Sequence, residues 1–192
     1  MTDTPFLTIV TRSYKKPECL KRNIESVQAQ TDQDLEQIFI VDDVGQGLAW
    51  ADLALNANKH RNNGKYIMVL DDDDIITNPN FVRLLKSITE RRDPDVVIWR
   101  GRFTEINLIL PVLDHYWNVK PIKSFIGSFN YCIRKEIYDE HIHLCYTGNC
   151  GDFDLIDSIF KREPPPNVIW FNKILVSTQQ KSQGTGQDYI GD

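Results

Sequence analysis

The chain of 192 residues lacks several features that would assign it to a specialised class of protein. It has no apolar run near the roughly 20 residues that span a bilayer, and no basic segment followed by an apolar one at its N-terminus, as a signal peptide would have. Basic residues are not in excess, since 27 Asp and Glu outnumber 22 Lys and Arg, which argues against a nucleic-acid partner. We therefore expect a soluble cytoplasmic protein, with peripheral attachment to the inner face of the membrane as the alternative.

Cysteine is also sparse, and none of the four cysteines forms a C-x2-C pair. Reduced thiols agree with a cytoplasmic location, because small secreted folds held by disulfides are much denser in cysteine. A zinc site is the rival interpretation, because His141, His143, Cys145 and Cys150 fall within ten residues. On a strand the first three would face the same way, although structural zinc sites usually have tighter, paired spacings.

The chain does contain an alternation of strand and helix patterns. Short apolar runs predict buried strands at 6–10, 37–41, 66–70 and 95–99. Helices are expected between them, from Pro17, over 48–60 and after Asn78-Pro79. Strand, helix and strand at this spacing require parallel strands joined by helical crossovers. We predict a single α/β domain with a Rossmann-like, mostly parallel central sheet.

The second half of the chain alternates less clearly, which predicts a compact, mixed region. Its expected elements are a strand at 130–133, a short helix at 153–160 and one or two strands at 168–176. The tail from Gln179 is polar and rich in glycine, so we expect it to be mobile. No linker or repeat divides the chain, so 1–192 is predicted to be one domain.

Polar residues follow three of the predicted strands, at 11–14, 42–43 and 71–74. Ligands bind beyond the carboxyl ends of the strands in an open parallel sheet, so we expect these residues to line one crevice. The four aspartates at 71–74 repel each other. Mn²⁺ or Mg²⁺, which prefers carboxylate oxygen, would relieve that repulsion. A solvated acidic turn that caps the helix after Asn78 is the alternative.

The order of these motifs resembles that of the family 2 glycosyltransferases, which have the GT-A fold. The similar segments are 14–20 and 26–31 (YKKPECL and SVQAQT, their first turn and helix), 40–43 (IVDD, the end of their second strand), 56–74 (ending in LDDDD, their DxD motif) and 151–155 (GDFDL, their Glu-Asp pair). The resemblance covers residues 6 to about 160. It implies a nucleotide-sugar-binding half at 6–100, an acceptor-side half at 101–178 and a tail at 179–192.

The resemblance also implies a nucleotide pocket. Tyr14 would pack on the nucleobase, Thr11 and Ser13 would line the pocket, and Asp42 would accept a hydrogen bond from the base. The donor would be a nucleotide-diphosphate sugar, with a UDP-sugar expected first.

A diphosphate and transfer site is implied in the same way. Asp71 or Asp72 would hold the ribose or a metal-bound water, and Asp73, with Asp71, would bind Mn²⁺ or Mg²⁺. Asp152 would be the general base of an inverting transfer to the hydroxyl of a saccharide or lipid-linked acceptor, in surface glycan or polysaccharide assembly. A carboxylate near a weakly nucleophilic hydroxyl suits that role, although Asp152 and Asp154 would also suit a helix cap.

Three departures from the family leave alternatives open. Arg12 stands where the family usually has Pro, and Gly151 replaces the Glu of the Glu-Asp pair. The compact acceptor region could be completed by a second subunit, so a homo-oligomer is one alternative. A catalytically degenerate module that binds nucleotide or metal is another. A sugar-phosphate nucleotidyltransferase is disfavoured, because residues 11–16 contain no glycine for a phosphate loop.

Overall fold

A mixed β-sheet lies at the centre of the computed structural model, which describes residues 4–146 and 151–179. Its strands are β1 (Leu7–Ser13), β2 (Leu35–Val41), β3 (Tyr66–Val69), β4 (Asp74–Ile76), β5 (Val96–Phe103), β6 (Leu108–Leu110), β7 (Tyr131–Arg134) and β8 (Val168–Thr178). The helices are α1 (Pro17–Gln28), α2 (Leu48–Asn58), α3 (Phe81–Thr89), α4 (Lys135–His141) and α5 (Gly151–Phe160), with a 3-10 turn at Ile142–Tyr146 after α4.

The strand order is β2-β1-β3-β7-β5-β8-β4, with β6 paired to β5. The strands β1, β2 and β3 are parallel, whereas β7 runs antiparallel to both of its neighbours. β8 is parallel to β5 and antiparallel to β4. The prediction of one α/β domain with a parallel front and a mixed back is confirmed. Because β7 and β8 lie among strands of the first half, both halves of the chain share one sheet.

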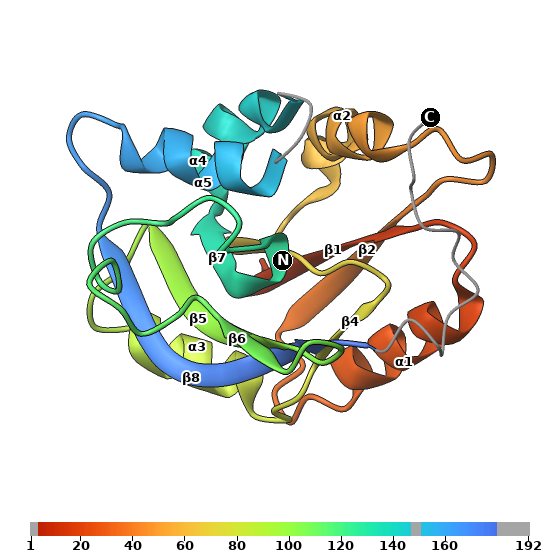
Figure 1. Ribbon diagram of the computed structural model, residues 1–192, viewed down its shortest axis with the longest axis horizontal. Helices are drawn as coiled ribbons and strands as arrows, with labels where there is room; N and C mark the ends of the chain where they lie inside the picture. The colour runs from red at the N-terminus through yellow and green to blue at the C-terminus, as the bar shows by residue number, and fades with distance from the viewer. Residues whose placement is uncertain (1–3, 147–150, 180–192) are drawn as a thin grey trace.

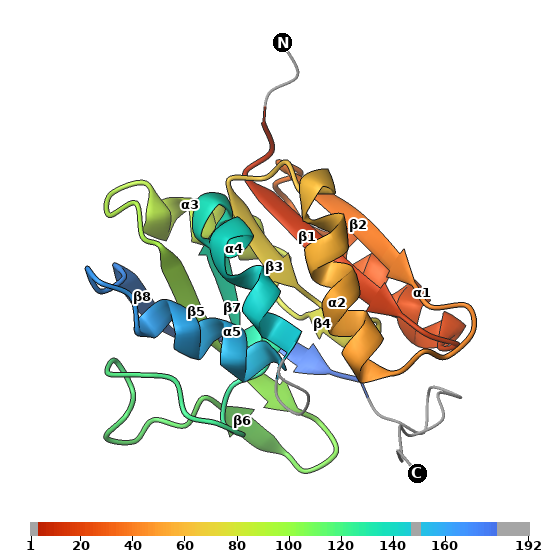
Figure 2. The same cartoon turned by 90° about the horizontal axis from the view of Figure 1, so that it is seen from above.

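Helices cover both faces of the sheet (Figure 1). Helices α2, α4 and α5 lie on one face, and α1 and α3 lie on the other (Figure 2). Neighbouring residues of β1 point to opposite faces, as the pleat requires. Val10 therefore joins a core with α2 and α5, whereas Ile9 joins a core with Phe81 of α3. The same alternation decides the direction of the residues at the end of β1.

Three elements were not anticipated from the sequence, namely β4, β6 and α4. Strands of three residues are too short for their periodicity to be recognised. Residues 168–178 form a single strand, which is one of the two predicted alternatives. The predicted tail begins too early, because Gln179 is buried and its backbone N–H donates to the carbonyl of Asp73. The rest of that tail, from residue 180, lies outside the described residues.

Of the possible zinc ligands, His141, His143 and Cys145 lie on helical backbone, in α4 and the turn after it, so the period of two that would align them is absent. His141 Nδ1 is 2.9 Å from the hydroxyl of Ser158, and Cys145 is a free, buried thiol. Over 4–146 and 151–179, no three His, Cys, Asp or Glu side chains are grouped to hold a metal ion. Cys150 lies outside these ranges.

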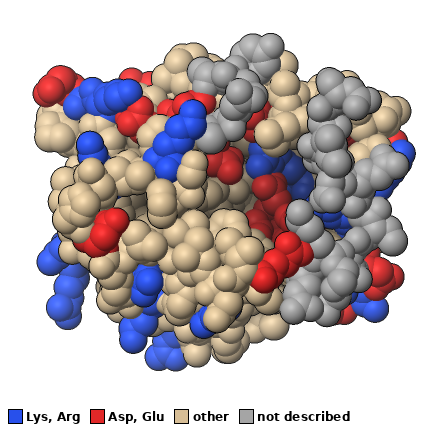
Figure 3. All heavy atoms as spheres, viewed as in Figure 1, with Lys and Arg blue, Asp and Glu red and all other residues tan. Residues whose placement is uncertain are grey.

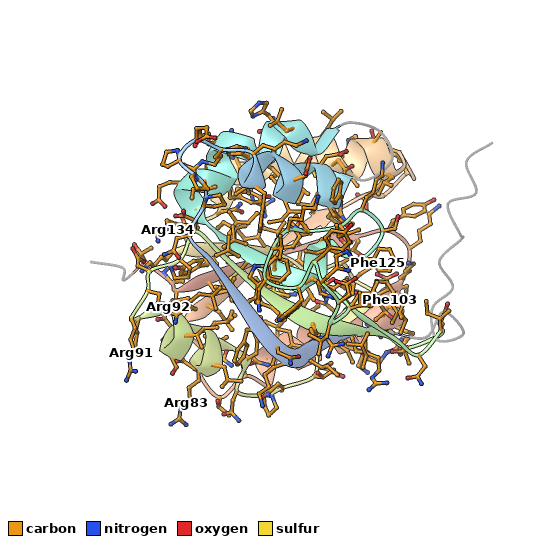
Figure 4. All side chains as sticks on the ribbon, turned by 60° about the vertical axis from the view of Figure 1, so that its left-hand side comes forward. Arg83, Arg91, Arg92, Phe103, Phe125 and Arg134 are labelled. Carbon is orange, nitrogen blue, oxygen red and sulfur yellow. The ribbon has the colours of Figure 1, made fainter. Side chains whose placement is uncertain are left out.

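Three exposed arginines lie on one side of the molecule. Arg83, Arg91 and Arg92 are exposed and point outward, away from the side that carries Phe103 and Phe125 (Figure 4). Arg91 and Arg92 precede the amino end of β5, and Arg83 lies in the first turn of α3. None of the helices among the described residues has the length and apolarity to span a bilayer.

Candidate active site

A cavity of about 190 Å³ lies beyond the carboxyl ends of β1, β2 and β3. One wall is apolar and consists of Ile40, Leu48, Trp50 and Ala51. The rest of the lining comes from residues 12–14, Lys16, Asp42 and the first three residues of the aspartate loop, which we define as Asp71–Asp74. The surface on this side has a hollow in which acidic and basic atoms lie side by side (Figure 3). The three polar strand ends therefore meet, as the parallel topology predicts.

Tyr14 and Asp42 both line the cavity. The Tyr14 ring lies so close to Gly45 that a Cβ there would overlap its hydroxyl oxygen, and Gly45 has a φ of +84°. The Asp42 carboxylate accepts hydrogen bonds from the backbone N–H groups of residues 44, 45 and 46, at 3.1, 2.8 and 2.6 Å. Burial raises the pKa of Asp42, but these bonds outweigh it and hold the pKa below its usual value. A carboxylate has about four acceptor positions, and backbone N–H groups already occupy three of them on Asp42.

Thr11 does not line this cavity, which corrects its predicted position. It is fully buried, and its hydroxyl accepts a hydrogen bond of 2.9 Å from the side chain of Gln37. The pleat of β1 turns Thr11 towards α1, where its hydroxyl also contacts Asn23 at 3.5 Å. Ser13 lies at the strand end and does line the cavity.

Arg12 faces α2 and α5 and is the main basic group of the site. It is 8% exposed, and its Nε and Nη2 donate to the two carboxylate oxygens of Asp71 at 2.6 and 2.7 Å. Its Nη1 donates to Asp52 of α2 at 2.7 Å. Its Nη2 is also 3.7 Å from Oδ1 of Asp152 in α5. A single guanidinium thus connects carboxylates from three different segments.

Asp152 lies beside this group, in a second cavity of about 170 Å³ that it lines together with Asp52, Gly151 and Phe153. Its Oδ2 accepts a hydrogen bond from the backbone N–H of Ser128 at 3.2 Å. Burial raises the pKa of the Asp152 carboxyl, and the charge of Arg12 opposes that rise. The arrangement gives the predicted general base an ordered carboxylate that faces open space.

The aspartates of the loop have different partners, since Asp71 pairs with Arg12 and Asp73 pairs with Lys16. Asp72 is buried, accepts from the backbone N–H of Tyr14 at 3.2 Å, and has a pKa raised by burial to about 6. Asp74 is buried at the start of β4, and burial raises its pKa well above the usual value. Asn23 fixes the loop, because its side-chain amide donates to the carbonyls of residues 71 and 74 at 2.9 Å.

Asp73 is the member of the loop that can offer oxygen to a cation. Its side chain is 44% exposed at the edge of the cavity, and its carboxylate accepts from Lys16 Nζ at 2.8 Å. Both oxygens of Asp71 already accept from Arg12. Mg²⁺ needs only one or two carboxylates when water and phosphate complete its shell. The donor set therefore fits a cation held by Asp73 and a diphosphate, while Asp71, the other predicted ligand, is held in a bidentate pair with Arg12.

Sequence reasoning missed Lys16, Trp50 and Asp52. Asp52 could have been noticed as the single charged residue in the otherwise apolar helix pattern of 48–58. Burial raises its pKa to about 6 in spite of the neighbouring Arg12. Lys16 and Trp50 carry no such signal, because a surface lysine and a half-buried tryptophan are both ordinary.

Sequence comparisons place the chain in no family. No family profile matches it, and no curated protein is recognisably similar. Its fold, in contrast, is that of solved glycosyltransferases. S. aureus TarS 1–349 in complex with UDP-GlcNAc superposes with a TM-score of 0.69 at 10% identity, covering 97% of this chain and 61% of that one. The chain thus spans about three fifths of the TarS 1–349 length.

Two further structures have the same fold. The mannosyltransferase PcManGT from Pyrobaculum calidifontis, in complex with GDP-Man and Mn²⁺, has a TM-score of 0.62 at 11% identity, over 92% of this chain and 57% of that one. A glycosyltransferase involved in glycosylation of the major capsid of PBCV-1 has a TM-score of 0.59 at 11% identity, over 91% and 94% of the two chains. The likeness establishes a GT-A-like fold for this chain.

Proposed function

We propose that the chain is an inverting, family 2-like glycosyltransferase that moves a sugar from a nucleotide-diphosphate sugar to an acceptor hydroxyl. The observation that carries the proposal is the pair of adjoining cavities. One is lined by aromatic and apolar side chains together with four aspartates, and the other is lined by Asp152. The fold supports it, because proteins of this fold bind UDP-GlcNAc and GDP-Man.

The donor would lie along the first cavity. Its base would pack on Tyr14 against the apolar wall and hydrogen-bond to Asp42, and its ribose would lie near Asp72. The diphosphate would then reach Asp73 and Lys16 at the acidic edge. Mn²⁺ or Mg²⁺, when bound at Asp73, would offset the charge that the diphosphate gains as it leaves. Carboxylates outnumber cationic groups along this cavity, so an anionic diphosphate would bind weakly without such a cation.

Asp152 would act in the second cavity as the general base. The acceptor oxygen forms a bond to the anomeric carbon while the bond from that carbon to the diphosphate oxygen breaks. The acceptor proton moves to Asp152, and the electron pair of the broken bond leaves with the diphosphate. Attack opposite the leaving group inverts the anomeric centre. The acceptor would be a saccharide or a lipid-linked saccharide, as in surface glycan assembly.

Thermal unfolding with UDP, GDP, dTDP and CDP, each with and without Mn²⁺, tests the donor site. A ligand at about 100 times its Kd adds about 2.7 kcal/mol of stability. For a chain of this length, that raises the melting temperature by about 5–10 °C. We expect such a shift with one nucleotide, UDP first, and only when Mn²⁺ is present. The absence of a shift with any of the four would contradict the proposal.

A nucleotide-binding module without transferase activity is the second candidate. It is favoured by Gly151, which leaves Asp152 without the adjacent acid that the resembled family has. Product formation from a radiolabelled UDP-sugar separates the two candidates, since a module would raise the melting temperature with UDP and Mn²⁺ but release no UDP from the donor.

A further inference from the structure

The cavity proposed for the donor, which we call the donor cavity, adjoins the second cavity. The residues between the two cavities have no role yet in the proposed mechanism. Leu48 lines both cavities. Arg12 and Asp71 line the first, and Asp52 and Asp152 line the second. The ion pair between Arg12 and Asp52 therefore crosses from one cavity to the other. A transferred sugar would have to lie at this junction, because the donor enters on one side and the acceptor on the other.

Burying the carboxylate of Asp52 at this position costs free energy of folding. It is 4% exposed on a helix whose other buried residues are Ala54 and Leu55, and a buried carboxylate is tolerated only when it is paired. Its partner Arg12 already donates two hydrogen bonds to the carboxylate of Asp71. Neutralising Arg12 therefore does not require Asp52.

The hydrogen bond from Arg12 to Asp52 instead fixes the position of the guanidinium. The bidentate pair joins Arg12 to the aspartate loop, part of which is exposed to solvent. The 2.7 Å bond from Nη1 to Asp52 joins the same guanidinium to α2. Arg12 thus connects the aspartate loop, which would hold the diphosphate, to α2, which contributes to the apolar wall of the donor cavity.

The start of α5 is shaped around the same carboxylate. A Cβ at Gly151 would overlap Oδ2 of Asp52 and the backbone carbonyl of Cys145, so no other residue fits there without movement. Asp52 therefore lies against the backbone that carries Asp152. Its carboxylate lies in the space that a side chain at position 151 would need.

We propose that Asp52 is a positioning residue for the transfer step, which holds Arg12 at the junction of the two cavities. Through Arg12 it sets the separation between the donor-side Asp71 and the acceptor-side Asp152. This inference rests on the proposed glycosyltransferase function. Displacing catalytic groups by about 1 Å can lower a rate on the order of 10²-fold, so a loosened Arg12 should slow transfer more than it weakens donor binding.

The test is Asp52→Asn in the full chain, with steady-state kinetics for the UDP-sugar that the native protein uses. The amide keeps the size of the side chain but removes its negative charge, so the charge-assisted hydrogen bond that holds Nη1 becomes weaker. We expect kcat to fall by about 10–100-fold, whereas the donor KM and the affinity for UDP with Mn²⁺ stay within about twofold. Asp157→Asn is the matched control, because Asp157 lies on α5 and pairs with Lys161 rather than with the site. It should leave kcat unchanged.

Each other outcome has a definite meaning. An unchanged kcat, or a rise in donor KM at unchanged kcat, would overturn the positioning role of Asp52 while the proposed function stands. No transfer and no donor hydrolysis by the native protein would overturn both. If Asp52→Asn fails to fold, Gly151→Ala provides the second variant, because it displaces the Asp52 carboxylate without removing a charge. A folded Gly151→Ala protein with native kcat would also overturn the inference.

Discussion

Replacing Arg12 by Met is expected to destabilise the fold strongly at neutral pH. The guanidinium is buried and makes three hydrogen bonds of 2.6–2.7 Å to Asp71 and Asp52. Removing one partner of a buried ion pair costs about 3–5 kcal/mol, because the other charge remains buried without compensation. Asp71 is partly exposed and can be solvated, so we expect a cost near 3 kcal/mol. That corresponds to a fall of about 6–12 °C in melting temperature.

Lowering the pH should recover part of that loss. Burial already raises the pKa of Asp52 to about 6 with Arg12 beside it, and without the guanidinium the pKa would rise further. A carboxyl whose pKa is higher in the folded state contributes stability at low pH that is lost as the pH rises through that pKa. The deficit of Arg12→Met should therefore shrink between pH 7.5 and pH 5.

Differential scanning calorimetry of native, Arg12→Met and Arg83→Met proteins over this pH range measures both effects. Arg83 is exposed on α3, so its replacement is the control for losing one positive charge. If Arg12→Met melts within about 2 °C of Arg83→Met at pH 7.5, the guanidinium does not compensate the buried carboxylates. A deficit that does not change with pH would refute the electrostatic explanation.

Two variants test the proposed donor and acceptor sites. Asp73→Ala should abolish the Mn²⁺-dependent rise in melting temperature with UDP, because Asp73 is the carboxylate available to the cation; unchanged UDP affinity in Mn²⁺ would remove it as a ligand. Asp152→Asn should retain UDP binding, measured by isothermal titration calorimetry, but lower transfer by about 10²–10⁴-fold, as expected for loss of a general base. Near-native transfer by this variant would move the base elsewhere, with Asp154 as the next candidate.

Much of the sheet could be predicted because its signals are local. The apolar runs of β1, β2, β3 and β5 and the proline at the start of α1 are readable without knowledge of the partners. The order of the strands in the second half of the chain could not be predicted from the sequence. The insertion of β7 between β3 and β5 depends on pairing across the whole chain, and four residues of β7 carry no signal for their neighbours.

The site was predictable in outline but not in its charge pairing. The polar strand ends could be grouped, because parallel strands bring their carboxyl ends together. Which aspartate faces which cation depends on side-chain geometry, so the pairing of Asp71 with Arg12 and of Asp73 with Lys16 required the structure. The wrong position of Thr11 had a simpler cause. Alternation along β1 puts Thr11 and Arg12 on opposite faces, and applying that rule would have excluded it.

The contacts of Gln179 determine when the aspartate loop receives its last hydrogen bonds during synthesis of the chain. Its side-chain amide donates to the carbonyls of Cys19 and Asp72, across 160 and 107 residues of sequence. The residues that line the donor cavity all leave the ribosome among the first 73. Gln179, which hydrogen-bonds to the backbone of the aspartate loop, follows β8 and emerges much later. Because chains emerge from the N-terminus, a nascent chain that stops short of residue 179 would expose the aspartates without this support. The hydrogen bond from Gln179 to the carbonyl of Asp72 would form only after β8, the last described strand, has been made.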